Sequence, residues 1–133
     1  MIDFIIHKLT TWGHKRTDIV AQGVIGSYAN NCAKSDSDLD LIIVSKNKNE
    51  LISNQEWLEL VGKPYSIQLE YYGKVTSLRV NYSFQPEIEY GVTDLSWVKS
   101  PLDPDTRKVI SGGMQAYYDP LDLLHNAVVE CTS

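Results

Sequence analysis

The sequence has few of the features that mark secreted, membrane or nucleic-acid-tracking proteins. Its only cysteines among 133 residues are Cys32 and Cys131, which make no disulfide framework, so we expect a reducing, cytoplasmic setting. No apolar run is long enough to span a membrane, and charged residues interrupt the apolar segment 1–12, unlike a signal peptide. The net charge is −5 and no basic stripe is visible, so neither a long nucleic acid nor a membrane is expected as a partner.

The sequence also lacks internal repeats, low-complexity runs and linkers, so we predict a single domain over 1–133 with a functional core at about 19–93. Apolar residues at helical spacing predict helices over about 2–11, 50–61 and 120–130, the last with Asp119 as N-cap and Pro120 at the first position. Alternation and apolar runs predict strands over 19–25, 38–44, 67–72, 77–84 and 87–92, and short edge strands at 109–110 and 114–118. Turns are expected at 35–37 and 85–86. The expected fold is α+β: a mixed, twisted sheet with helices packed on one face and a polar second face.

The most informative stretch runs from Gly26 to Val44. Gly26-Ser27 ends a strand, and glycine lets the backbone approach a ligand closely beside a serine hydroxyl. The next strand opens with Asp38-Leu39-Asp40, whose two carboxylates share one face because side chains alternate along a strand. Adjacent carboxylates repel, and a divalent cation such as magnesium removes that cost. The stretch therefore predicts a phosphate-approach turn beside a metal site, although a polar turn before a solvent-edged strand is the simpler alternative.

This pattern resembles the nucleotidyltransferase superfamily that includes DNA polymerase beta and the bacterial antibiotic nucleotidyltransferases. Its signature is Gly-Ser, a spacer and Asp-x-Asp opening a hydrophobic strand, and the resemblance covers about 20–92. It implies the polymerase-beta-like fold and transfer of a nucleoside monophosphate, most often AMP, from a nucleoside triphosphate such as ATP to a hydroxyl, with two Mg²⁺ ions. Asp38 and Asp40 would hold the ions, and Gly26 and Ser27 the β and γ phosphates.

Two basic residues are candidates for nucleotide binding. Lys34 could add a positive charge beside the phosphates, or be simply solvated. Arg79 could neutralise the triphosphate or pair with one of the acids on the polar face. Many relatives carry arginine and glycine where this chain has Asn30 and Asn31, which removes one phosphate contact.

A third carboxylate is expected to bind metal and act as the base. Glu89, flanked by apolar residues in Ile88–Val92, fits the family's slot best, with glutamate in place of the more frequent aspartate. Glu87 on the same face and Glu70 on another strand remain alternatives, as does the absence of a third acid.

The acceptor is expected to be a small molecule or a protein. Antibiotic-modifying relatives append a helical domain that builds the acceptor pocket, so we expect a second subunit, as in a homodimer, or a helical partner to complete the site, or a protein surface to be the acceptor. Two alternatives are an antitoxin-type nucleotidyltransferase that acts on a helical toxin, and a nucleotide-binding module that has lost catalysis.

Overall fold

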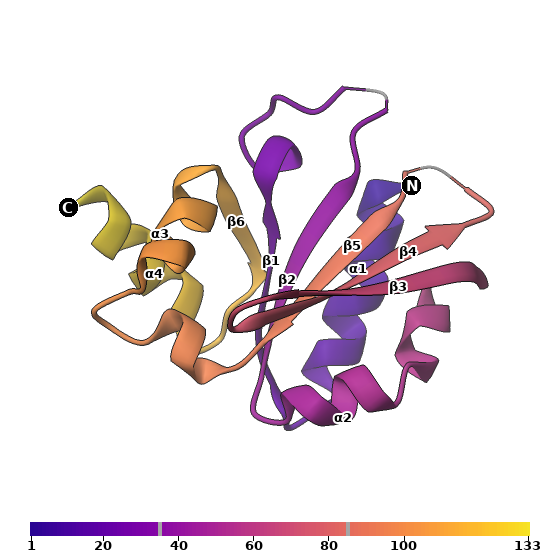
Figure 1. Ribbon diagram of the computed structural model, residues 1–133, viewed down its shortest axis with the longest axis horizontal. Coiled ribbons are helices and arrows are strands. Elements are labelled where there is room, and N and C mark those ends of the chain that lie inside the picture. Colours follow the sequence, from indigo (N-terminus) through magenta and orange to yellow (C-terminus); the bar gives the residue numbers. More distant parts are fainter. Residues whose placement is uncertain (35, 85) are drawn as a thin grey trace.

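The computed structural model describes residues 1–34, 36–84 and 86–133; Ser35 and Gln85, which the sequence places in turns, lie outside the described residues. Within these residues a six-stranded mixed sheet has the order β3-β4-β5-β2-β1-β6 (Figure 1). The strands are β1 (Ile19–Ile25), β2 (Leu39–Ser45), β3 (Pro64–Tyr72), β4 (Val75–Tyr82), β5 (Ile88–Thr93) and β6 (Met114–Tyr118). The helices are α1 (Ile2–His14), α2 (Lys48–Ser53), α3 (Pro104–Ser111) and α4 (Leu123–Thr132). Short 3₁₀ turns lie at Gly26–Tyr28, Glu56–Leu60 and Leu95–Val98.

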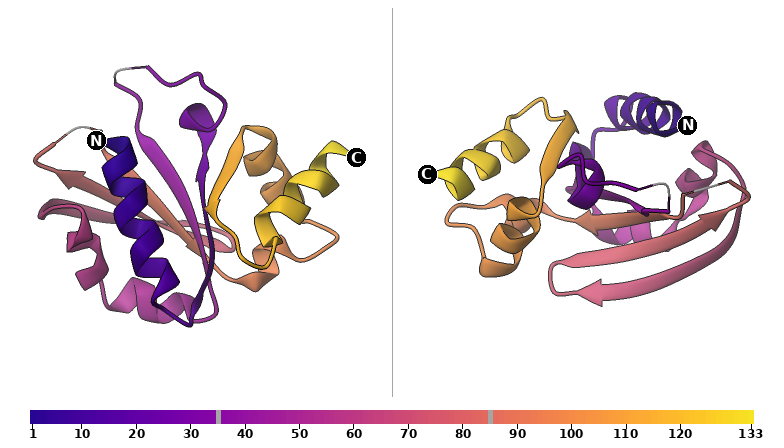
Figure 2. Two further views of the ribbon diagram at one scale, coloured as in Figure 1. Left: turned by 180° about the vertical axis from the view of Figure 1, so that it is seen from behind. Right: turned by 90° about the horizontal axis from the view of Figure 1, so that it is seen from above.

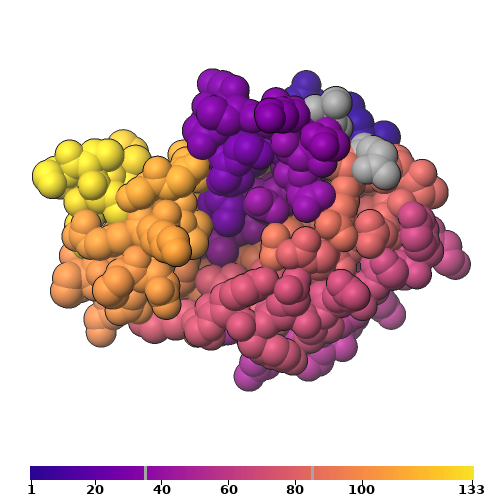
Figure 3. Space-filling view, turned by 45° about the horizontal axis from the view of Figure 1, so that its top comes forward, coloured from indigo at the N-terminus to yellow at the C-terminus, as the bar shows by residue number. Residues whose placement is uncertain are grey.

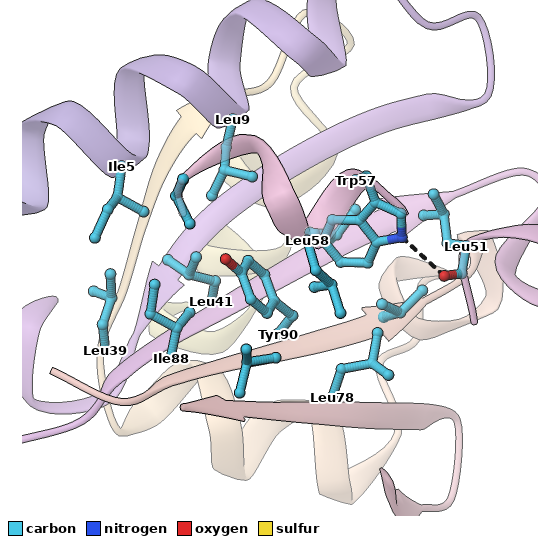
Figure 4. Packing of buried hydrophobic residues seen from close by; sticks show 14 of the residues in the cluster. Ile5, Leu9, Leu39, Leu41, Leu51, Trp57, Leu58, Leu78, Ile88 and Tyr90 are labelled. Atoms are coloured by element: carbon cyan, nitrogen blue, oxygen red, sulfur yellow. Dashed lines mark hydrogen bonds between the residues drawn. The ribbon is translucent and has the colours of Figure 1, made fainter. Parts of the chain in front are cut away.

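The main core lies on the face of the sheet covered by α1, α2 and the turn at Glu56–Leu60. Ile5 and Leu9 of α1 pack onto β2, whose Leu39 and Leu41 point toward them, and Trp57 closes the far end (Figure 4). The Trp57 indole donates to the backbone carbonyl of Leu51 at 2.9 Å, so its polar atom is satisfied inside the core. Apolar burial on this face fixes which side of each strand points inward.

A second, smaller core lies on the opposite face, at the β6 end of the sheet. There α3 and α4 group beside β6 (Figure 2), and their Ile110 and Leu124 pack with Ile42 and Val44 of β2. Because Asp38 and Asp40 alternate onto that same face, one part of it is covered by helices and the other part carries carboxylates. The carboxylates therefore lie on an uncovered part of this face, next to the part that α3 and α4 cover.

The predicted α+β class and mixed sheet are confirmed. The bounds of β1 and β6 are as predicted, and α1, β2 and β5 lie within a few residues of their predicted positions. Helices cover the main-core face as expected. The helix predicted at the C-terminal end is found as α4, but its packing together with α3 on the opposite face was not predicted from the sequence. None of the helices that the structure describes is both long and apolar enough to cross a bilayer.

The single helix predicted over 50–61 is wrong, because the structure breaks it into α2 and the turn at Glu56–Leu60. Asn54 lies at the break with an extended backbone, φ −107° and ψ 101°. Its side-chain oxygen accepts from the N–H of Glu56 at 3.3 Å. Asparagine side chains compete with helical backbone bonds in this way, and the competition ends α2.

The edge strand predicted at 109–110 is also wrong, because these residues belong to α3. Asp103 and Pro104 start that helix, with proline in its first turn. Thr106 and Ile110, four residues apart, are buried on one side of it. The helical spacing of these buried residues therefore decides the local structure, although the adjacent β-branched residues Val109 and Ile110 favour a strand.

The final helix begins at Leu123, three residues later than predicted. Asp119 nevertheless caps it: its two carboxylate oxygens accept from the N–H groups of Leu124 (3.2 Å) and His125 (2.9 Å). Asp122 precedes the helix in a left-handed conformation, φ 56°, and makes no side-chain cap bond. The predicted capping residue is thus correct in role, and Pro120 lies before the helix instead of in its first turn.

We expect Asp119→Ala to lower the free energy of unfolding by about 1 kcal/mol, because two helix N–H groups lose their acceptor. Urea denaturation followed by circular dichroism would measure it. Asp122→Gly is the matched control and should change stability little, since Asp122 caps nothing and glycine accepts a positive φ. An equal loss in both variants would contradict the capping role of Asp119.

Candidate active site

The bend at Gly26 lies directly against Asp40. Ile25, the last residue of β1, pairs with Asp40 in the β1–β2 ladder, and Gly26 follows with φ 75°. A Cβ atom at Gly26 would lie 3.2 Å from Oδ2 of Asp40. The positive φ and this close approach both favour glycine, so the bend and the acid form one site.

Two hydrogen bonds to the C-terminal part of the chain fix the position of the bend. The N–H of Gly26 donates to the carbonyl of Gly113 (3.1 Å), and the side chain of Asn30 donates to the carbonyl of Gly112 (2.9 Å). Gly113 has φ 120°, and a Cβ there would lie 2.9 Å from the carbonyl oxygen of Gly26. Asn30, where many relatives carry arginine, therefore ties the bend to the α3–β6 turn. The sequence analysis did not identify this contact, although the Gly112-Gly113 pair marks a close backbone approach.

The acidic residues converge because three neighbouring strands align them in one row. Asp40 of β2 pairs with Glu89 of β5, which in turn pairs with Arg79 of β4. Asp38 shares the face of Asp40 and keeps 42% of its side chain exposed. Of the three candidates for the third acid, Glu89 is the one directly opposite Asp40 in the β2–β5 ladder.

Arg79 lies at the centre of this acidic cluster. Its guanidinium is 2.7 Å from Glu70, 3.4 Å from Glu87, 3.6 Å from Glu89 and 3.8 Å from Asp38. The hydrogen bond to Glu70, followed by the charges of the neighbouring acids, raises the pKa of Arg79 despite its partial burial. Of the two predicted roles of Arg79, the structure shows pairing with acids; a contact with triphosphate stays a prediction.

The contact between Asp40 and Glu89 is unfavourable when both are ionised. Burial of Asp40, followed by the charge of Glu89 and their mutual hydrogen bond, raises the pKa of Asp40 to about 7. The pair therefore retains a proton near neutral pH, in a position where a bound cation would remove the same repulsion.

The side chains of this cluster are of the chemical type that binds magnesium. Asp38, Asp40 and Glu89 offer hard carboxylate oxygens on one open face, which is what Mg²⁺ prefers. In the described ranges 1–34, 36–84 and 86–133, no three acidic, histidine or cysteine side chains are already gathered as a metal cage. Arg79 contacts both Asp38 and Glu89, so these carboxylates are turned toward the guanidinium.

The remaining predicted nucleotide-binding residues differ in their positions. Ser27 is half-buried in the 3₁₀ turn, directly after Gly26. Lys34 is exposed in the connection to β2, where its backbone N–H donates to the hydroxyl of Ser37 at 2.8 Å. The ion pairs among described residues do not include Lys34, so the structure does not bring its ammonium group to the cluster.

A pocket of about 470 Å³ adjoins Asp40 and Glu89. It lies between α3 and the turn that joins β3 to β4, and the surface is hollowed where these segments approach residues 26–40 (Figure 3). Gly91 lines it without a side chain, which lets Val75 and Ile42 pack closely there: a Cβ at Gly91 would lie 3.1 Å from Val75 and 3.2 Å from Ile42. Its other lining residues include Ser77, Trp97, Asp103, Asp105, Thr106, Lys108 and Val109.

The β3–β4 turn is clamped over this pocket. The carbonyl of Lys74 accepts from the hydroxyl of Thr93 (2.7 Å) and from the ammonium group of Lys48 (2.9 Å). The ammonium group of Lys74 pairs with Asp103, just before α3. Sequence reasoning missed this pocket because it read residues 109–110 as a strand and so placed no helix over the polar face.

Comparison with known families agrees with this geometry. A family model described as a nucleotidyltransferase domain matches residues 12–106, which is more than half of the chain. The match includes β1, the Gly26 bend, and the strands that carry Asp38, Asp40 and Glu89. A search of curated proteins found no match. The chain therefore belongs to the nucleotidyltransferase domain family.

Proposed function

We propose that this protein transfers a nucleoside monophosphate, most often AMP, from a nucleoside triphosphate to a hydroxyl group, with magnesium. The observation that carries the proposal is the convergence of the Gly26 bend with Asp40 and Glu89 at one open part of the sheet. Membership of the family supports nucleotidyl transfer in general. The metal, the nucleotide and the acceptor are part of the proposal.

Each residue has a distinct task in this proposal. Gly26 and Ser27 present backbone and hydroxyl groups to the phosphates, since no side chain at Gly26 blocks a close approach. Asp38, Asp40 and Glu89 are the metal ligands, and bound Mg²⁺ would neutralise phosphate charge and align the attacking and leaving oxygens. Glu89 also accepts the proton of the acceptor hydroxyl. Arg79 positions the acids through its salt bridges.

The pocket beside Glu89 supports a small-molecule acceptor. Its volume of about 470 Å³ lies within the range of ordinary ligand sites. Apolar residues such as Trp97 and Val109 could bind the body of an acceptor, while Lys74 and Asp103 offer polar contacts at the border. A hydroxyl at the inner end would lie beside Glu89, where deprotonation is needed. A screen of small hydroxyl compounds with labelled ATP and Mg²⁺ tests the reaction directly.

We expect Asp40→Asn and Asp38→Asn each to abolish magnesium-dependent ATP binding in isothermal titration, because each removes a metal ligand. Equal ATP affinity in wild type and either variant would refute the metal-site assignment.

The two variants should differ in stability when metal is absent. The folded-state pKa of Asp40, about 7, is above its ordinary value of 3.8, so the folded protein loses stability as the pH rises between these values. Asp40→Asn should therefore raise the free energy of unfolding by about 2–4 kcal/mol at pH 8, and by less at pH 5. Asp38→Asn, which loses a contact with Arg79, should bring no such gain. Urea titrations in a chelating buffer at both pH values would measure this, and a gain that does not grow with pH would contradict it.

Glu89→Gln should lower the turnover number by about 10²–10⁴-fold, because a proton acceptor is lost. ATP affinity should change much less, because Asp38 and Asp40 would bind both ions whereas Glu89 would complete the shell of one. The rate of pyrophosphate release with an acceptor from the screen would measure this. Glu70→Gln is the matched control: Glu70 also pairs with Arg79 but lies on β3, which β4 and β5 separate from the strand of Asp40. If Glu70→Gln slows turnover and Glu89→Gln does not, the third acid is misassigned.

Filling the pocket should affect the acceptor and not the nucleotide. Val109→Trp places a large side chain in the pocket from α3, away from the acids, and should raise the acceptor KM about tenfold or more. The Kd for ATP with Mg²⁺ should stay within about twofold of wild type. Loss of ATP affinity with an unchanged acceptor KM would show that the pocket holds the nucleoside instead.

A further inference from the structure

Strand β3 forms a free edge of the sheet. It is first in the strand order, where it is the outermost strand (Figure 1), and its nine residues pair with β4 on one side. The opposite edge, β6, has five residues and packs against α1, α3 and α4. Proteins usually protect long edges with lysine, proline, bulges or short length. In β3, proline and an irregular pairing are confined to the start of the strand, at Pro64–Ser66.

The exposed residues of β3 are large and apolar. Tyr65 and Tyr71 keep 72% and 74% of their surfaces exposed, and Ile67 and Leu69 keep 38% and 37%. Ile67, Leu69 and Tyr71 alternate onto one face, the face of the main core, because Ile67 and Leu69 pair with core residues of β4. Tyr65 precedes them, at the irregular start of the pairing. A stripe of this kind on an unpaired edge indicates that another strand covers it.

The sequence of β3 matches itself when it is reversed. Residues 65–71 read Tyr-Ser-Ile-Gln-Leu-Glu-Tyr, so tyrosine stands at both ends, branched aliphatic residues stand on either side of the centre, and Gln68 is the centre. An antiparallel pair of identical strands related by a two-fold axis at Gln68 would place tyrosine against tyrosine and isoleucine against leucine. Aromatic and aliphatic cross-strand pairs of this kind stabilise antiparallel sheets.

We propose that two copies of this chain pair through β3, antiparallel and centred on Gln68, to form a continuous sheet across a homodimer. Tyr65 then faces the partner's Tyr71, and Ile67 faces the partner's Leu69. The two-fold axis is perpendicular to the sheet, so the apolar face of one copy continues into that of the other. The proposal does not depend on the chemistry of the acidic cluster.

Charge favours the same pairing. Glu70 is the one charged residue of β3, and in this register it faces the partner's Ser66. The two copies of Glu70 are therefore not opposite each other, and like charges directly opposite would be destabilising. Within its own chain Glu70 is already paired with Arg79 at 2.7 Å, so the interface does not need to neutralise it.

The available area fits a dimer of moderate affinity. Tyr65, Ile67, Leu69, Tyr71 and Tyr72 together leave roughly 500 Å² uncovered per copy, taking about 200 Å² for a whole side chain of this size. The strand backbone adds to this, which brings the total near the ~600 Å² per partner of the smallest specific interfaces. We therefore expect a dissociation constant in the micromolar range.

Charged substitutions at the two tyrosines test both the edge and the register. Sedimentation equilibrium from low micromolar to several hundred micromolar protein should show wild type passing from monomer to dimer. Tyr65→Lys with Tyr71→Lys places lysine against lysine across the axis and should weaken the dimer at least tenfold. Tyr65→Lys with Tyr71→Glu places opposite charges against each other and should restore dimerisation relative to the double-lysine variant. Both tyrosines are exposed, so circular dichroism should show all three proteins equally folded.

Three results would overturn the proposal. The first is a wild-type protein that stays monomeric at every concentration, even if its β3 strand bound a different protein. A dimer that persists in the double-lysine variant would show that another surface forms it. A dimer lost in both double variants would exclude the register centred on Gln68, because in that register the lysine at 65 and the glutamate at 71 of the other copy attract each other. Within one copy, residues 65 and 71 are too far apart for their charges to meet.

Discussion

The contact between Asp40 and Glu89 is the constraint on which the site depends. The parallel pairing of β2 with β5 sets these carboxylates side by side, and partial burial makes their joint ionisation costly. The fold tolerates the contact because Arg79 lies within salt-bridge distance of Glu89 and because the pair retains a proton. A fold optimised for stability alone would place one apolar residue here, so the retained repulsion supports the proposal of a bound cation at this position.

The geometry around this contact depends on residues distant in sequence. Gly26 approaches Asp40 closely, and its own position is fixed by the turn at Gly112-Gly113, which follows α3. The same α3 forms one wall of the pocket beside Glu89. One helix and its following turn therefore position both the phosphate-approach bend and the neighbouring cavity. A change in the packing of α3 would alter the two together.

The sequence was sufficient to predict the features set by local alternation. Asp38 and Asp40 share a face because strand side chains alternate, and the apolar residues between them assign that face to the outside. The choice among Glu89, Glu87 and Glu70 was beyond local reasoning, because it depends on which strand pairs with β2. Helix α3 was missed for a related reason: its apolar pair precedes two glycines, and only packing against Ile42 distinguishes a short helix from a strand there.

Arg79 contacts four acids, at different distances. Glu70 and Glu87 are its closest partners, at 2.7 and 3.4 Å, whereas Glu89 and Asp38 lie at 3.6 and 3.8 Å. Glu70 and Glu87 also accept hydrogen bonds from the guanidinium, whereas the contacts with Glu89 and Asp38, the proposed metal ligands, are ion pairs at longer distance. A cation bound by Asp38, Asp40 and Glu89 would leave Arg79 with Glu70 and Glu87 as partners. The arginine can therefore stay in place while the acids turn from it to a metal, which explains how one cluster accommodates both charges.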